Sequence, residues 1–392
     1  MSGLTASLLA VGLVGAVTVE TPRTGHVVVA SAPRDTTSAF GSAETGDTET
    51  TPATDLTTTT TAAASSPTTA RPQTATTTAP AAVTTHQPAS LQSGIYVVDA
   101  DGGTPRRIVA GTGIHRLSFS PDGKRVTYMV KNQVWSVPAT GGAAAPLTPE
   151  SAFMVEATWS SSGRFLAYGS SDDAAKPAHL MLLEVATGET RDLGELNWSE
   201  GSVAWQKHAD VLVFSNFKTL VVHNALTRES FPVFPEPAAF APFAWSDDGD
   251  ELAYRSQNDL AVFTFTDTNH YTTDRPKRIV ATSSGPKDPV WIGDQIYFVN
   301  PWKLDVAAAP GGNQRNVVSG YTGSLRVAAK NSTTLFLSIG ADAGNVANRR
   351  IERVALDGSD RRVIVNPIAR HQIQDYAVSP QGDTVAFWAV GE

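Results

Sequence analysis

The chain contains no cysteine. This absence excludes a disulfide framework, thiolate catalysis and zinc sites built on cysteine ligands. Charged residues are also scarce, at 17% of the chain, and the formal net charge is −8. Because no run of basic residues offsets this negative charge, the composition argues against a protein that binds nucleic-acid phosphates.

Linear signatures of catalysis are missing as well. The chain has no Gly-x-Ser-x-Gly nucleophile elbow, no His-Glu-x-x-His zinc motif, no P-loop and no dinucleotide-binding glycine motif. Its eight histidines never pair at metal-ligand spacing on one element, and the acidic segment 247–250 lacks the spacing of a calcium-binding loop. These absences favour a protein that is not an enzyme, although carboxylates scattered over a repeat fold can still form a catalytic site.

Large apolar residues are rare in the first quarter of the chain outside one short run. Residues 4–19 are largely apolar, but 16 residues is short of the about 20 that span a bilayer, and no Lys or Arg precedes them. The run predicts a signal peptide or an N-terminal membrane anchor within residues 1–30, with a disordered apolar tail or a start site further upstream as alternatives. Residues 31–93, rich in Thr, Pro and Ala, cannot bury enough surface to fold and are predicted to form a disordered stalk.

The folded region is organised around a hairpin pattern at residues 117–128. Leu117 and Phe119 alternate with polar residues, which is typical of a half-buried strand. The segment Pro121-Asp-Gly123 then supplies the residues that a tight turn needs, and Val126 begins the alternation again. The pattern therefore predicts two antiparallel strands joined by a short turn.

The hairpin recurs along the chain at a spacing that predicts a β-propeller. The position of Phe119 repeats at offsets of 40, 46, 40, 46, 37 and 50 residues, at Trp159, Trp205, Trp245, Trp291, Ala328 and Val378. A second apolar strand follows each copy, and a third strand and a short fourth strand precede the next one. Four strands in about 40 to 50 residues are typical of a propeller blade, so the copies predict seven four-stranded antiparallel blades.

The ends of the folded region predict how the ring closes. Residues 95–109 contain two strands that precede the first hairpin, whereas residues 375–390 contain a hairpin without a third and fourth strand. The N-terminal strands can therefore complete the C-terminal blade, which removes the exposed edges of an open array. The predicted fold is an all-β, seven-bladed propeller over residues 94–392.

The hairpin sequences resemble a known repeat. Leu117-Ser-Phe-Ser-Pro-Asp-Gly-Lys124, the Trp-Ser-x-x-Gly variants and the Asp-Gly-Gly and Thr-Gly turns resemble the TolB-like, WD-like propeller repeat. Similar repeats occur in the propeller domains of prolyl-oligopeptidase-type peptidases. The resemblance covers residues 94–392 and implies the fold alone, because it extends to no Tol-specific or peptidase domain. The units around Trp291 and Ala328 depart from it, since they lack the Ser-Pro-Asp-Gly turn.

The alignment of the blades also brings a set of charged residues together. The first strand of each blade lines the central channel of a propeller, so the residue three before each aligned position is expected near the channel mouth. The charged side chains at these positions and one step earlier are His115, Arg116, Glu156, Lys287, Asp288 and Asp375. Their convergence would make a polar funnel that binds a small polar ligand or an ion, with a water-filled channel as the alternative.

Together these patterns predict an extracytoplasmic protein that is secreted, periplasmic or anchored at the cell surface. We expect a monomeric, non-catalytic propeller that binds or scaffolds a protein, peptide or glycan, with no nucleic-acid partner and no required cofactor. A second hypothesis is a propeller hydrolase, lyase or lactonase with a divalent ion, such as calcium, in the central channel. A third is a cell-envelope spacer without a specific ligand.

Overall fold

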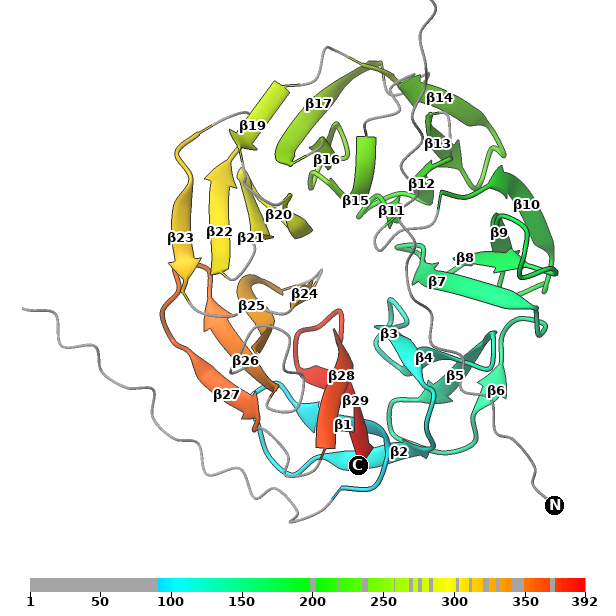
Figure 1. The fold of residues 1–392 in the computed structure, drawn as a ribbon, viewed down its shortest axis with the longest axis vertical. Coiled ribbons are helices and arrows are strands. Elements are labelled where there is room, and N and C mark those ends of the chain that lie inside the picture. The colour runs from blue at the N-terminus through cyan, green and yellow to red at the C-terminus, as the bar shows by residue number, and fades with distance from the viewer. Residues whose placement is uncertain are drawn as a thin grey trace, which may run out of the picture. The chain divides into compact units, whose positions relative to one another are not determined.

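Seven β-sheets follow one another around a ring in the computed structural model of the chain (Figure 1). The structure describes residues 91–391 except for gaps at 198–201, 217–218, 235–238, 257, 268–270, 274–276, 282–284, 301–302, 310–311, 320–323, 329–330, 340–348 and 367–370. The predicted signal or anchor in residues 1–30 and residues 31–90 of the predicted stalk lie outside the described residues. Within the described part, no helix is long and apolar enough to cross a membrane.

Each of the first three blades in chain order is a four-stranded antiparallel sheet. Blade 1 comprises β3 (His115–Phe119), β4 (Arg125–Val130), β5 (Gln133–Pro138) and β6 (Ala145–Pro146). Blade 2 comprises β7 (Phe153–Trp159), β8 (Phe165–Ser171), β9 (His179–Glu184) and β10 (Thr190–Glu195). Blade 3 comprises β11 (Val203–Trp205), β12 (Val211–Ser215), β13 (Leu220–Asn224) and β14 (Ser230–Phe234).

The next three blades follow the same plan, with one addition. Blade 4 comprises β15 (Ala239–Trp245), β16 (Glu251–Ser256), β17 (Asp259–Asp267) and β19 (Lys277–Ala281), and a short extra strand, β18 (Thr272–Thr273), also pairs with β17. Blade 5 comprises β20 (Lys287–Ile292), β21 (Gln295–Asn300), β22 (Lys303–Ala308) and β23 (Arg315–Val318). Blade 6 comprises β24 (Ser324–Ala328), β25 (Asn331–Ile339), β26 (Arg350–Ala355) and β27 (Arg362–Val365).

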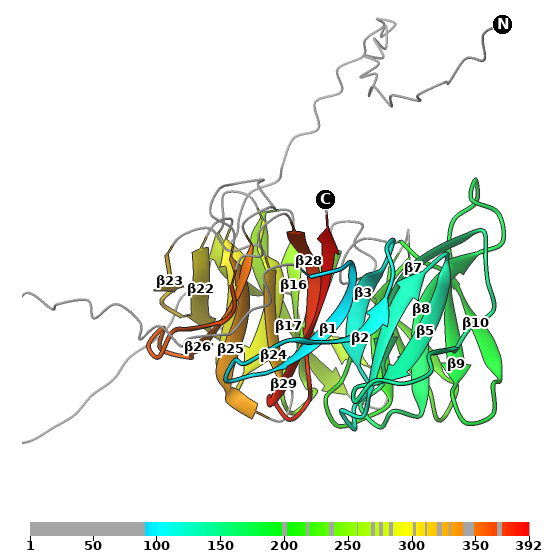
Figure 2. The ribbon, with the colours of Figure 1, turned by 90° about the horizontal axis from the view of Figure 1, so that it is seen from below.

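Blade 7 joins the two ends of the folded region. Its strands are β28 (His371–Val378), β29 (Thr384–Gly391), β1 (Gly94–Asp99) and β2 (Arg106–Ala110), in the sheet order β2-β1-β29-β28. The pairing of β1 with β29 runs without a break from Gly94 opposite Ala389 to Asp99 opposite Thr384, and both views place these strands side by side (Figures 1 and 2). The predicted seven-bladed propeller and its closure by the N-terminal strands are therefore confirmed.

Apolar side chains fill the interfaces between the blades. Seven clusters of buried apolar side chains occur among the described residues, and each draws its members from two consecutive blades. Successive side chains of a strand point to opposite faces of the sheet, so each blade presents apolar side chains to the blade on either side of it. Leu91, just ahead of β1, is buried in the cluster between blades 6 and 7. The core is thus a ring of seven interfaces, and closing the ring buries the last of them.

The aligned positions of the repeat lie at the ends of the innermost strands. Phe119, Trp159, Trp205 and Trp245 are the last residues of β3, β7, β11 and β15. The three indole N–H groups donate to the preceding blade, at 3.2, 3.2 and 3.1 Å, to Thr127 Oγ1, Thr158 O and Ala204 O respectively. Each tryptophan therefore packs into an interface and also links two blades. The indole N–H of a buried tryptophan needs a hydrogen-bond partner, and here the preceding blade supplies it.

The serine of the repeat supports the turn between the first and second strand. In blade 1, Ser120 is 6% exposed, its hydroxyl donates to Asp122 Oδ1 at 2.6 Å, and its Oγ accepts the Arg125 N–H at 3.0 Å. Gly123 has a φ of 72°, which is the conformation that glycine adopts without strain. In three other blades a buried serine likewise accepts a backbone N–H with its Oγ, at Ser160, Ser246 and Ser379. The Ser-Pro-Asp-Gly sequence is therefore explained by the hydrogen bonds of the hairpin.

Candidate functional site

The residues predicted at the channel mouth lie on the innermost strands, at positions where the pairing is irregular. Arg116, Glu156 and Asp288 occupy equivalent places in β3, β7 and β20, and their φ angles are 56°, 35° and 46°. Each lies at a shift in register between the first and second strand of its blade. Such a bulge re-aims a side chain relative to its strand, and positive φ is uncommon for residues other than glycine. The propeller therefore holds these three residues in a special conformation at the inner edge of the ring.

The three carboxylates of the predicted funnel each accept a backbone hydrogen bond from the next blade. Glu156 Oε2 accepts the Ser202 N–H at 3.2 Å and the Ser202 hydroxyl at 3.0 Å. In the same way, Asp288 Oδ2 accepts the N–H of Leu325 at 3.1 Å. These bonds join blades 2 and 3 and blades 5 and 6. A hydrogen bond to an ionised acceptor is stronger than one between neutral groups, so the carboxylates stabilise the ring.

Asp375 forms the corresponding bond where the ring closes. Its Oδ2 atom accepts the N–H of Leu117 in blade 1 at 2.8 Å, and its Oδ1 atom accepts the N–H of Tyr376 at 2.8 Å. The structure thus distributes the three carboxylates over three blade junctions.

His115 and Lys287 are exposed beside their bulges, and His115 Nδ1 lies 3.3 Å from the Gly113 carbonyl oxygen. The ligand-binding role of the six predicted residues stays a prediction.

The acidic segment at residues 247–250 belongs to a turn and its contacts. The pKa of Asp248 is lowered, first because the Ser246 hydroxyl donates to it and then because the Asp250 N–H does. Asp247 Oδ1 binds the ammonium of Lys207, and its Oδ2 atom accepts the Gly293 N–H at 3.1 Å. In the described part of the chain, no three His, Asp or Glu side chains gather in a way that could hold a metal ion. The calcium of the second hypothesis stays a prediction.

The turns between first and second strands also contact one another from blade to blade. Ser162 Oγ donates to Asp210 at 2.7 Å between blades 2 and 3, and Gln206 Nε2 donates to the Gly249 carbonyl at 3.1 Å between blades 3 and 4. The Lys207 ammonium also donates to the carbonyl of Trp291 in blade 5, at 2.6 Å. Sequence reasoning did not reveal these contacts, since each needs two turns from different repeats.

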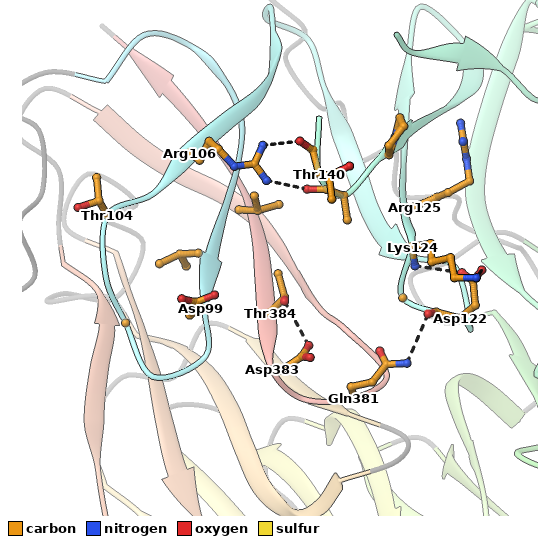
Figure 3. A pocket seen from close by; sticks show the side chains of 16 residues that line it. Asp99, Thr104, Arg106, Asp122, Lys124, Arg125, Thr140, Gln381, Asp383 and Thr384 are labelled. Atoms are coloured by element: carbon orange, nitrogen blue, oxygen red, sulfur yellow. Dashed lines mark hydrogen bonds and ion pairs between the residues drawn. The ribbon is translucent and has the colours of Figure 1, made fainter. Parts of the chain in front are cut away.

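A groove lies between blades 7 and 1, at the seam where the ring closes (Figure 3). Its volume is about 940 Å³. Three acidic and three basic residues line it together with neutral polar groups; the charged ones are Asp99, Asp122, Asp383, Arg106, Lys124 and Arg125. With equal numbers of the two signs, the groove is suited to a neutral or dipolar polar ligand better than to a polyanion.

Most of the charged side chains in the groove already form hydrogen bonds within the protein. Arg106 extends from β2 and donates to the carbonyl oxygens of Thr140 at 2.8 Å and Ala139 at 3.0 Å, as Figure 3 shows. Arg125 Nε donates to Ser136 Oγ at 2.6 Å. These bonds fix both walls of the groove, because they tie the side chains to the backbone or to a neighbouring strand.

Two charged side chains remain available for a ligand, one on each blade. Lys124 has a side chain that is 80% exposed, and its ammonium lies 3.8 Å from Asp122 Oδ2. Such a solvent-exposed pair contributes little to stability and exchanges easily with a ligand. Asp99 is exposed at the end of β1 and has no side-chain partner among the described residues. The groove thus presents a carboxylate on blade 7 and an ammonium on blade 1.

The sequence contains only part of the signal for this groove. The predicted closure brings residues 94–109 beside the last hairpin, so the two walls could be expected to meet. The groove itself depends on how the turns at residues 100–105, 120–124 and 379–383 fold against one another. That packing involves residues from both ends of the propeller, and no local pattern encodes it.

Comparisons with known proteins identify the fold. No protein-family model matches the chain, and no curated protein matches it. Among solved structures, a putative TolB from Agrobacterium tumefaciens shares 14% identity over 77% of this chain and 99% of that chain, with a TM-score of 0.48. Hydrazine synthase from Kuenenia stuttgartiensis shares 12% identity over 69% of this chain and 90% of that chain, with a TM-score of 0.52.

A prolyl endopeptidase structure is also similar. It shares 18% identity over 75% of this chain and 45% of that chain, with a TM-score of 0.52, so this chain spans less than half of the endopeptidase. At these identities the similarities show the fold and not the function, since one fold serves many activities. The resemblance to TolB-like propellers, limited to the propeller itself, is in this sense confirmed. The chain is a seven-bladed β-propeller.

Proposed function

We propose that this protein is a non-catalytic, extracytoplasmic binding or scaffold module that engages a protein, peptide or glycan. The observation that carries the proposal is the groove between blades 7 and 1. It is large enough for a ligand, at about 940 Å³, and its walls are strands and turns of a rigid sheet scaffold. Residues 31–93 would act as a flexible stalk, and residues 1–30 as an export signal or a tether.

The groove favours a peptide segment among these ligands. A peptide carries both charged side chains and a polar backbone, so it can pair with Asp99 on one wall and with Lys124 on the other. The hydroxyl and amide groups of Thr104, Thr140 and Gln381 also line the groove and can bond to backbone groups. A glycan would use the same hydroxyl and amide groups but would make no ion pair with Asp99 or Lys124.

The experiment that tests this proposal uses charge reversal on each wall. The full chain is screened against a random-peptide display library and a panel of soluble glycans, and the binders are measured on three variants. We expect Asp99→Lys and Lys124→Glu each to weaken binding about tenfold or more, which corresponds to about 1.4 kcal/mol. Lys176→Glu is the matched control, because Lys176 is 74% exposed in a similar surface pair with Asp173 but lies in blade 2.

The outcomes separate the proposal from its alternatives. A binder that loses affinity in both groove variants and keeps it in the control supports the groove. Peptide binders that are unaffected by either reversal would overturn the groove as the peptide site, and the absence of any binder from both screens would favour a cell-envelope spacer. The extracytoplasmic location is tested separately, by cell fractionation and by the accessibility of the full chain to protease added outside intact cells.

A further inference from the structure

A half-buried arginine and a buried histidine lie near one another between blades 2 and 3. Arg191 in β10 is paired with Leu182 of β9, whose side chain belongs to the apolar cluster between these blades. His223 in β13 is paired with Leu212 of β12, which belongs to the same cluster. Residues paired across an antiparallel sheet point to the same face, so Arg191 and His223 point to the shared interface. The Arg191 Nη2 group donates to the carbonyl of Ala225, 3.2 Å away and close to His223 in the chain.

Three nitrogen atoms at this interface are buried and have no hydrogen-bond partner among the residues that the structure describes. They are Nε and Nη1 of Arg191 and Nε2 of His223. His223 is only 2% exposed, and its Nδ1 atom lies 2.8 Å from the Ser230 hydroxyl. The guanidinium of Arg191 lies over the ring of Phe165, 5.6 Å from its centre, and its Nη2 group donates to the Ala225 carbonyl. Buried polar groups in folded proteins nearly always have a partner, so these three nitrogens indicate a missing one.

Two carboxylates near this interface are paired with other cations. Glu184 accepts from Arg164 at 2.8 Å, and Glu189 lies 3.4 Å from Arg228. No carboxylate pairs with Arg191 among the residues that the structure describes. Buried N–H groups of a charged side chain are costly when they have no acceptor, and an added anion would lower this cost.

The protonation state of His223 is compatible with an anion bound at the interface of blades 2 and 3. Burial, and then the charge of Arg191, lower the pKa of His223 to about 4, so the ring is neutral near pH 7. If the Ser230 hydroxyl donates to Nδ1, the neutral ring carries its proton on Nε2 and donates there. Both residues then offer N–H donors, and the guanidinium supplies a full positive charge.

We propose that the interface of blades 2 and 3 holds a small inorganic anion, namely chloride, between the guanidinium of Arg191 and the Nε2–H of His223. The anion links β10, the outermost strand of blade 2, to β13, the third strand of blade 3. It stabilises the ring at a junction remote in sequence from the groove residues, and it is independent of the binding function proposed above.

Thermal melting of the full chain tests the anion site. The protein is melted in sodium chloride and in sodium gluconate at equal ionic strength, because gluconate is too large to be buried. We expect the melting temperature to rise with the logarithm of the chloride concentration above that in gluconate, since a ligand that binds only the folded state stabilises it by mass action. Arg191→Met keeps the stem on Phe165 and removes the charge, so it should abolish the difference between the salts.

A matched variant and a second measurement complete the test. Arg164 also lies over the ring of Phe165, at 5.1 Å, but it is paired with Glu184, so Arg164→Met should keep the response to chloride. If Arg191→Met does not fold, the chloride-35 line width of the full-length wild type, narrowed by competing bromide, reports the site directly. Equal melting in the two salts, or no line broadening, would overturn the proposal and leave a bridging water as the partner of these nitrogens.

Discussion

Replacing Asp375 should open the seam at which the ring closes. The carboxylate accepts the N–H of Leu117 from blade 1 and the N–H of Tyr376 within its own strand, both at 2.8 Å. Leu117 is 7% exposed, so its N–H has little access to water if the acceptor is removed. A hydrogen bond to a charged group contributes about 1.5–3 kcal/mol, and a buried donor left without a partner adds to the loss. We expect Asp375→Ala to lower the free energy of unfolding by about 2–3 kcal/mol.

The size of this effect can be measured by calorimetry on the full chain. For a domain of this size, 1 kcal/mol shifts the melting temperature by about 2–4 °C, so Asp375→Ala should melt about 4–12 °C below the wild type. Asp375→Asn retains an acceptor oxygen and should lose only about 1 kcal/mol. Asp173→Ala is the control, since that carboxylate is 51% exposed and lies 4.0 Å from Lys176. An alanine variant at Asp375 that melts within about 1 °C of the wild type would refute the structural role and leave the carboxylate free for a ligand in the channel.

Three further predictions concern the turns, the buried histidine and the metal hypothesis. Ser379→Ala should cost about 1–3 kcal/mol in urea unfolding, because the N–H groups of Asp383 and Thr384 lose their acceptor, whereas the exposed Ser359→Ala should cost much less. The pKa of His223 is about 4 in the folded protein, below its usual 6.5, so its neutral form stabilises the fold fully above about pH 6.5. In chloride-free buffer the urea midpoint should therefore fall as the pH drops from about 6.5 to 4, and His223→Gln should fall less over that range. For a non-catalytic module, melting of the full chain should be the same in millimolar calcium and in chelator; stoichiometric calcium with a rise in melting temperature would instead support the hydrolase hypothesis.

The channel-mouth residues illustrate how far a repeat alignment can go. Counting three positions back from each aligned aromatic found Arg116, Glu156 and Asp288, which share the same bulged, positive-φ conformation. The alignment thus identified structurally equivalent positions in blades whose turns differ. It could not predict that each carboxylate accepts a hydrogen bond from the following blade, because the acceptor and its donor belong to different repeats.

The sequence by itself determined the number of blades, the hairpin in each blade and the closure of the ring. Those features rest on local patterns, namely the alternation of apolar residues, the serine and glycine of the turn, and the spacing of Phe119 and the tryptophans. The tertiary structure alone decided what lies between blades. The groove that presents Asp99 and Lys124 and the interface that brings Arg191 near His223 each combine two faces that meet only when the ring is formed. Their geometry depends on how one blade packs on the next, and the period of a single strand contains no information about that.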